Sequence, residues 1–291
     1  MVSHAILQYV SKVDCPVSGA YAREQLTAWL KENDPFLETK VHRKIKKILA
    51  SSSGKNARRF LQHFSSPSFD SLDACLEGLS LAQKEVHEAS CFYTQVTRVF
   101  THRQYSVAFV IDICAGNGLN GMLWLLSGAA QHVYFIDKNI ETASGYKVRK
   151  RLDALGYASS YSYLCQDITH QESTIQELEA IQKNHHNGTG IITAMHACGT
   201  LTDKIMLYAH HTHMPFAVVP CCQKRGMGSL SPFSEQQNAV FAGYFTSESD
   251  YVDTLRVVAL VQRGYDIQLC ALPSAVTLKN RVIIGFPTKN N

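Results

Sequence analysis

Seven short apolar runs, separated by polar segments long enough for helices, constrain the fold of this chain more than any other feature. Each run is continuous instead of alternating with polar residues, which is typical of strands buried under helices on both faces of a sheet. The runs cover residues 107–111, 133–136, 162–165, 191–195, 216–219, 267–272 and 282–286. The last two leave no room for a full helix between them. We therefore expect an α/β fold with a mostly parallel seven-stranded sheet that ends in an antiparallel hairpin.

The chain of 291 residues is long enough for one sizeable core and an additional segment. Helical spacing of apolar residues predicts helices over residues 20–64 and 72–100, before the first run. We expect two parts: a helical N-terminal extension over 1–104, partly facing the functional cleft, and a domain over 105–291 that contains the sheet.

Composition excludes several classes of protein. Hydrophobic residues make up 45% of the chain and charged residues 18%, as in ordinary globular proteins. No long apolar segment occurs, and the N-terminus lacks the features of a signal peptide. The nine cysteines are odd in number and scattered, so we expect reduced thiols and not a disulfide framework. These features favour a cytoplasmic protein without membrane association.

The first apolar run leads into a Gly-rich turn over residues 112–121, with the sequence DICAGNGLNG. Glycines in such a turn let the backbone approach a bound nucleoside without a clash at Cβ. Cys114 stands where the usual D-x-G-x-G-x-G pattern has its first glycine, which alters the expected turn geometry. We expect this segment to contact a cofactor through Asp112, Cys114, Gly116, Asn117 and Gly118.

Two more acidic residues follow the next two runs. Asp137 ends the second run and is placed to accept hydrogen bonds from ribose hydroxyls, with Lys138 beside it. Asp167 follows the third run and is placed near an adenine amino group, with Ile168 against the ring. Three acidic residues in this order predict a nucleoside cofactor. NAD is the main competing ligand, and Asp112 and Cys114 count against it.

Reactive side chains follow the fourth and fifth runs, in the segments MHACGTLTD (195–203) and VPCCQK (219–224). The carboxyl ends of parallel strands meet at one cleft, so both segments should face the cofactor. His196 is either a general base, since an unperturbed histidine pKa lies near 6.5, or a residue that bonds loop backbone and shapes the cofactor pocket.

Cys198, Cys221 and Cys222 allow three roles: a polar, close-packed pocket wall, a thiolate nucleophile, or a metal site together with His196. Two adjacent cysteines cannot easily both point at one ion. We therefore expect no metal here and favour the pocket wall.

The H-x-C-G segment at 196–199 and the C-C pair at 221–222 resemble a family of methyltransferase-like proteins. The same pairing resembles the glutathione S-transferase C-terminal-domain-containing protein and the tRNA 2'-O-methyltransferases of the acceptor stem. Residues 80–88 are similar to the family's K-K-x-H-E segment, and residues 277–281 to its closing strand, so the resemblance covers about 79–286. It implies a class I, Rossmann-like methyltransferase that uses S-adenosylmethionine, in which Asp112 lies near the methionine moiety.

The resemblance also implies contacts to the substrate. Lys84, His87 and Glu88 fall at i, i+3 and i+4 and so share one helical face, which is either a charged rim of the cleft or an ordinary solvated face. Asn280, in the closing segment, is the fourth expected contact. No N-P-P-Y or D-P-P-Y segment follows the fourth run, so methylation of adenine or glutamine amino groups is not supported.

A basic segment lies between Glu38 and Asp70, where no acidic residue occurs. Lys and Arg contacts to phosphates supply the sequence-independent part of nucleic-acid affinity, so we expect RNA, either tRNA or rRNA, as substrate and no obligate protein partner. The segment also carries apolar residues at helical spacing, which leaves an ordinary solvated helix open. A protein or small-molecule methyltransferase, or a non-catalytic module that binds cofactor or RNA, are the alternatives. The basic residues are Lys40, Arg43, Lys44, Lys46, Lys47, Lys55, Arg58 and Arg59.

Overall fold

The computed structural model describes residues 83–139, 143–185, 188–223, 234–245, 247–272, 277 and 280–288. Within them, seven strands form one sheet in the order β3-β2-β1-β4-β5-β7-β6. The strands are β1 (Phe109–Ile113), β2 (His132–Asp137), β3 (Tyr161–Cys165), β4 (Gly190–Met195), β5 (Phe216–Val219), β6 (Tyr265–Ala271) and β7 (Arg281–Pro287). The helices predicted over 20–64, and the basic segment, lie outside the described residues.

The pairing of the strands confirms the predicted fold class. Strands β1 to β5 pair in parallel, whereas β7 pairs antiparallel with both β5 and β6. The first strand begins two residues later than predicted, at Phe109, and this shift places Asp112 inside the strand. The closing hairpin differs from a full crossover because only a short connection joins β6 to β7.

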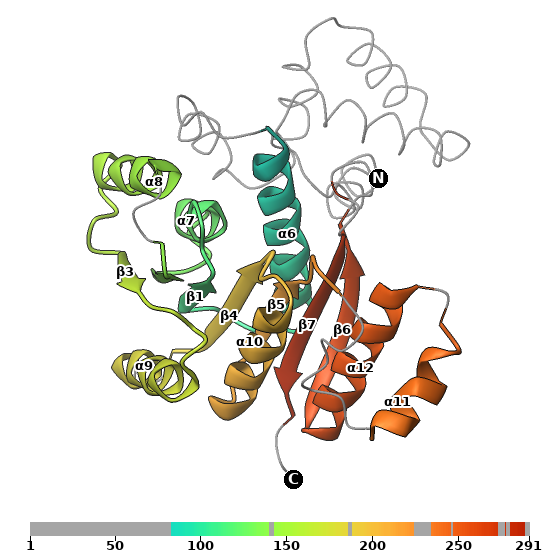
Figure 1. The fold of residues 1–291 in the computed structure, drawn as a ribbon. Coiled ribbons are helices and arrows are strands. Elements are labelled where there is room, and N and C mark those ends of the chain that lie inside the picture. The colour runs from blue at the N-terminus through green and yellow to red at the C-terminus, as the bar shows by residue number, and fades with distance from the viewer. Residues whose placement is uncertain are drawn as a thin grey trace, which may run out of the picture.

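Helices cover both faces of the sheet (Figure 1). One apolar core lies between the sheet and α6, α7 and α8, and a second core lies between the other face and α9, α10 and α12. The helices are α6 (Gln83–His102), α7 (Leu119–Leu126), α8 (Ala143–Ala154), α9 (Gln171–Asn184), α10 (Thr200–His211), α11 (Glu235–Ala242) and α12 (Glu248–Gln262). Burial on both faces explains why the strands read as continuous apolar runs.

Helix α6 confirms the C-terminal part of the helix predicted over 72–100. Its side chains Phe92, Val96 and Phe100 are almost completely buried in the first core, against α7 and the sheet. The division of the chain at residues 104 and 105 stays a prediction. None of the helices in the described part has the length and apolarity needed to span a bilayer.

Candidate active site

A cleft lies at the carboxyl ends of β1, β2 and β4 and consists of two hollows, of about 300 and 260 Å³. Cys114 and His196 border both hollows, so the two adjoin at these residues. The first hollow is closed by the start of α6 and the second by the loops after β2 and β3. Among the residues of the first are Glu88, Asp112, Asn117 and Asn120, and among those of the second are Asp137, Lys138, Asp167, Ile168 and Cys198.

The Asp112 carboxylate is buried at 2% exposure at the floor of the first hollow. Its Oδ1 accepts hydrogen bonds from Asn120 Nδ2 at 2.6 Å and from Thr193 Oγ1 at 3.0 Å, and its Oδ2 accepts one from the Gly121 amide at 3.1 Å. Burial raises the pKa of Asp112 to about 7, although these hydrogen bonds oppose the shift. Sequence reasoning placed Asp112 correctly in the cleft but missed Asn120 and Thr193. The one available signal was the position of Asn120 in the first helical turn after the glycines.

Asn120 also carries an acceptor that suits a cationic ligand. Its Oδ1 is buried and makes no hydrogen bond within the described part of the chain, and Asn120 borders the first hollow beside Asp112. A buried acceptor without a partner is costly, so such an atom marks a place for a ligand donor. A carbonyl oxygen next to a carboxylate fits the ammonium group of an amino acid.

The Gly-rich turn takes the left-handed backbone conformation at three positions, Cys114, Gly116 and Gly118, with φ of 56°, 55° and 76°. Cys114 thus has the left-handed conformation that suits the glycine of the D-x-G-x-G-x-G pattern at this position. The replacement of that glycine therefore leaves the turn in a tight, left-handed conformation. At Gly118 a Cβ would lie 2.8 Å from Tyr163 Oη, so this position has no room for a side chain. Burial raises the pKa of the Cys114 thiol to about 12, which keeps it neutral.

Hydrogen bonds from side chains after β1 and at the end of β2 stabilise the Gly-rich turn. Asp137 Oδ2 accepts a hydrogen bond from the Gly116 amide at 2.9 Å, and Oδ1 accepts one from the Asn139 amide at 2.8 Å. Asn117 Nδ2 donates to Glu85 Oε2 on α6 at 3.2 Å. Asp137 is half-buried at the edge of the second hollow, with Lys138 exposed beside it. Its contact with a ribose stays a prediction.

The residues predicted to face adenine border the same hollow. Asp167 is half-buried, and its Oδ1 accepts a hydrogen bond from the Thr169 amide at 2.9 Å. This hydrogen bond lowers the pKa of the Asp167 carboxyl and keeps it ionised. Ile168 is only 4% exposed and packs mainly into the second core, with its edge toward the hollow.

His196 follows β4 and lies where the two hollows meet. Its backbone is left-handed, with φ of 57°, and its amide donates to the Val219 carbonyl at 3.1 Å, which joins the loop after β4 to the end of β5. The Nε2 atom of its ring lies 3.1 Å from Glu88 Oε2 on α6. The Glu88 side chain is 7% exposed and that of His196 35%, so the carboxylate is buried behind a ring that reaches the cleft.

The four residues predicted to contact the substrate lie in different places relative to the cleft. Glu88 borders the first hollow but pairs with His196, a partnership that the sequence did not predict. Lys84 and His87 fall in α6, and their side chains lie outside the described residues. Asn280 borders neither hollow. It precedes β7, and its carbonyl accepts a hydrogen bond from the Leu272 amide at 2.6 Å, closing the hairpin.

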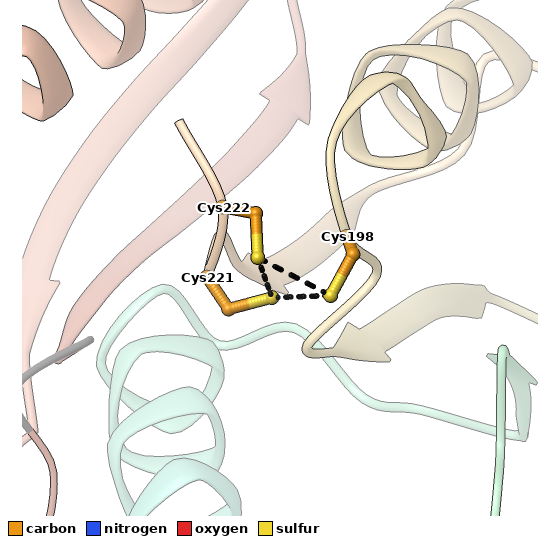
Figure 2. Close-up of side chains that lie close together, drawn as sticks. All are labelled: Cys198, Cys221 and Cys222. Atoms are coloured by element: carbon orange, nitrogen blue, oxygen red, sulfur yellow. Dashed lines mark hydrogen bonds between the residues drawn. The ribbon is translucent and has the colours of Figure 1, made fainter. Parts of the chain in front are cut away.

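The three candidate cysteines come together beside the second hollow (Figure 2). Cys198 Sγ lies 2.9 Å from Cys221 Sγ and 3.5 Å from Cys222 Sγ, and the Sγ atoms of Cys221 and Cys222 are 3.7 Å apart. Desolvation raises the pKa of Cys198 and that of Cys221, so these thiols are neutral on their own. A neutral thiol is a poor nucleophile, which gives no support to the thiolate hypothesis.

The sheet order, the closing antiparallel hairpin and the cleft at the carboxyl ends of β1, β2 and β4 are those of a class I, Rossmann-like methyltransferase. Comparison with protein families agrees: residues 83–226, about half of the chain, match the family model described as "Methyltransferase domain". The protein is therefore an enzyme that uses S-adenosylmethionine as methyl donor. No curated protein matches the chain.

Several solved structures have similar folds, and three of them serve as examples. The methyltransferase domain of bacterial Hen1 (CtHen1-C) is 10% identical, with 70% of this chain and all of that chain covered (100%) and a TM-score of 0.44. An O-methyltransferase family protein from Burkholderia thailandensis is 10% identical. The match covers 80% of this chain and 71% of that chain, with a TM-score of 0.38. The fibrillarin pre-rRNA processing protein of Methanococcus jannaschii is 10% identical. The match covers 64% of this chain and 68% of that chain, with a TM-score of 0.39. These likenesses are too distant to carry an argument about the substrate.

Proposed function

We propose that this methyltransferase acts on RNA and that it is a relative of the methyltransferase-like proteins with H-x-C-G and C-C segments. The observation that supports RNA best is the exposed basic and aromatic surface of α8, which begins six residues after Asp137 at the nucleoside end of the cleft. The basic segment at residues 39–69, in the sequence before the described residues, adds further positive charge.

Helix α8 presents the side chains that a nucleic acid needs. Lys147 and Lys150 are exposed, and Tyr146 is 57% exposed although it is a large aromatic residue. The lysines suit contacts to phosphates, and the exposed ring beside them suits stacking on a base. The neighbouring Arg149 lies over the Tyr163 ring, with its Cζ 5.0 Å from the ring centre, and so anchors the helix to β3. Tyr146, Lys147 and Lys150 are the side chains of α8 that we propose to contact RNA.

The cleft residues fit S-adenosylmethionine. Asp112 and the Asn120 carbonyl would hold the ammonium group of its methionine part, Asp137 the ribose hydroxyls, and Asp167 with Ile168 the adenine. When bound, the cofactor supplies an electrophilic methyl group on a sulfonium. The chain itself contributes position and exclusion of water, because the cofactor groups are held by side chains that are already hydrogen-bonded in place.

His196 is the proposed proton acceptor for the methyl-accepting group. With the Glu88 carboxylate as acceptor of its Nε2–H, the ring is held in one orientation and Nδ1 keeps its lone pair. The ring borders both hollows and is partly exposed, so an acceptor hydroxyl entering the cleft can reach it. In the alternative, His196 only joins the loop after β4 to β5 and shapes the cofactor pocket, as its hydrogen bond to Val219 would allow.

The substrate class can be tested with S-adenosylmethionine that carries a labelled methyl group. The labelled cofactor is incubated with the protein and with an extract of cells that lack this protein. We expect label in material that RNase removes and protease does not. The double variant Lys147→Glu/Lys150→Glu should lower this labelling about 10-fold or more, because two phosphate contacts become repulsive. The matched control is Lys183→Glu on α9, an exposed lysine beneath the other face of the sheet.

Other outcomes would assign a different function. Protease-sensitive label would identify a protein methyltransferase, and label in small molecules would identify a metabolite methyltransferase; either result contradicts RNA as the substrate. If calorimetry shows cofactor binding but no fraction is labelled, the protein is a non-catalytic binding module. His196→Ala should abolish transfer while sparing cofactor binding, and retained transfer would return His196 to a structural role.

A further inference from the structure

The three sulfur atoms of Cys198, Cys221 and Cys222 form a triangle with sides of 2.9, 3.5 and 3.7 Å. A tetrahedral zinc ion with Zn–S bonds near 2.3 Å separates its sulfur ligands by about 3.8 Å. Two sides of the triangle already have nearly this length. The third, between Cys198 and Cys221, needs a small rotation of one side chain to open by about 0.9 Å.

The two adjacent cysteines point to the same place, contrary to the argument made from the sequence. In an extended strand Cys221 and Cys222 would point to opposite sides, but β5 ends at Val219 and the chain after Pro220 is no longer a strand. Both sulfurs therefore turn toward Cys198, on the loop before α10 (Figure 2). A disulfide would use only two of the three sulfurs and does not explain why the third converges.

A buried arginine holds both loops in position. Arg256, on α12, is 1% exposed, and its Nη2 donates to the carbonyl of Gly199, next to Cys198, at 3.2 Å. Its Nη1 donates to Asp253 Oδ1 at 2.9 Å, and Asp253 Oδ2 accepts from Gln223 Nε2 at 3.1 Å. The same Gln223 nitrogen donates to the Pro220 carbonyl at 3.3 Å. One hydrogen-bonded network thus fixes the residues on either side of the cysteines, as the outer shell of a metal site does.

We propose that Cys198, Cys221 and Cys222 form a three-thiolate site for a thiophilic divalent cation of the Zn²⁺ class. Thiolates are the ligands that zinc prefers, and zinc needs only three protein ligands when water or a ligand takes the fourth position. Cys221 is buried whereas Cys198 and Cys222 are exposed, so the triangle has an inner and an open side. Because Cys198 also borders the second hollow, a bound ion would lock the loops after β4 and β5 at the edge of the cofactor cleft.

Metal binding to the reduced full chain, stripped of metal by a chelator, tests the site without any assay of methyl transfer. Zn²⁺ should bind one ion per chain in competition with a chromophoric chelator. Co²⁺ should bind with thiolate charge-transfer bands and the intense visible bands of a tetrahedral ion. Cys198→Ser and Cys222→Ser should each weaken Zn²⁺ binding about 100-fold or more and remove the charge-transfer bands.

The matched control is Cys165→Ser, an exposed free cysteine at the end of β3 that should leave zinc binding unchanged. Circular dichroism checks that the serine variants fold, which is expected since Cys198 and Cys222 are exposed. Equal zinc affinity of wild type, Cys198→Ser and Cys222→Ser would overturn the proposal. So would metal-free protein, as isolated, in which peptide mapping finds a Cys198–Cys221 disulfide.

Discussion

Glu88 Oε2 lies 3.1 Å from His196 Nε2, although 108 residues separate the two in the chain. The contact joins the first described turns of α6 to the loop after β4, across the mouth of the cofactor cleft. An imidazole at a cleft rotates freely unless something holds it, and here a buried carboxylate holds one of its nitrogens. Through this pair α6 contributes a side chain to the lining of the cleft as well as to the core.

Removing the Glu88 carboxylate should slow methyl transfer more than it weakens cofactor binding. We expect Glu88→Ala to lower kcat about 10- to 100-fold, because the His196 ring loses the partner that orients it. Glu88→Gln should recover much of the loss, since its amide oxygen still accepts the Nε2–H bond. Steady-state kinetics with calorimetry of S-adenosylmethionine binding measures both effects.

Glu172→Gln serves as the control for that pair, because Glu172 is an exposed residue in the first turn of α9. Its rate should equal that of wild type. If Glu88→Ala and Glu88→Gln both keep full kcat, Glu88 does not position His196.

The buried carboxyl of Asp112 should make stability depend on pH. Its pKa is about 7 in the fold against an ordinary value of 3.8, so the folded chain binds more protons than the unfolded chain between these pH values. The free energy of unfolding should therefore fall as pH rises from about 4 to about 7, by roughly 2–4 kcal/mol from this group. Below this window both states are protonated, and above it both are ionised.

Urea unfolding of wild type and Asp112→Asn across this pH range isolates the contribution of Asp112. The difference between the two curves should change by the amount given above, because asparagine does not titrate, while all other groups cancel. S-adenosylmethionine should reduce the loss in wild type by placing a cation beside the carboxylate. Parallel curves for the two proteins would show that Asp112 is not shifted.

Gly121→Ala should destabilise the protein although alanine is the better helix former. A Cβ at Gly121, in α7, would lie 2.3 Å from Phe135 Cε1 and 2.7 Å from Val133 Cγ1, both in the buried sheet. Overpacking of this kind costs about 1–3 kcal/mol or more, which outweighs the gain of about 1 kcal/mol in helix propensity. Thermal unfolding measures the change, and an equal or higher Tm would contradict the close approach of α7 to β2.

Gly128→Ala is the comparison for Gly121→Ala. Gly128 has a positive φ of 69°, but no atom lies within 4 Å of the added Cβ. Its cost should be limited to about 1–2 kcal/mol of backbone strain.

Two arginines in ion pairs should contribute differently to the free energy of unfolding. Arg256 donates to Asp203 Oδ1 at 2.5 Å and to Asp253 Oδ1 at 2.9 Å, with all three side chains at 2% exposure or less. Arg256→Leu leaves buried carboxylates facing an apolar side chain, which should cost about 3–5 kcal/mol. Arg103 pairs with Asp266 at 2.7 Å in an exposed position, and Arg103→Met should cost about 1 kcal/mol or less. Chemical denaturation of both variants tests the contrast, which equal losses would refute.

Much of the fold could be predicted from sequence because burial on both faces leaves a local signature. Each strand is a continuous apolar run, and the observed strands differ from the predicted ones by no more than two residues at either end. The acidic residues Asp112, Asp137 and Asp167 could be placed near one cleft for a related reason. The carboxyl ends of parallel strands meet at one edge of a sheet, whatever their distance along the chain.

The contacts inside the site were decided by the tertiary structure. The Glu88–His196 pair, the hydrogen bond of Thr193 to Asp112 and the convergence of Cys198 with Cys221 and Cys222 each join elements that are remote in sequence. Side-chain direction decides such contacts, and it depends on strand register, on the rotation of a helix about its axis and on the exact residue at which a strand ends. Sequence alone thus indicated the class of enzyme and the edge of the sheet where the candidate site lies. Packing decided which atoms meet there, because a contact of 3 Å depends on coordinates that no local pattern encodes.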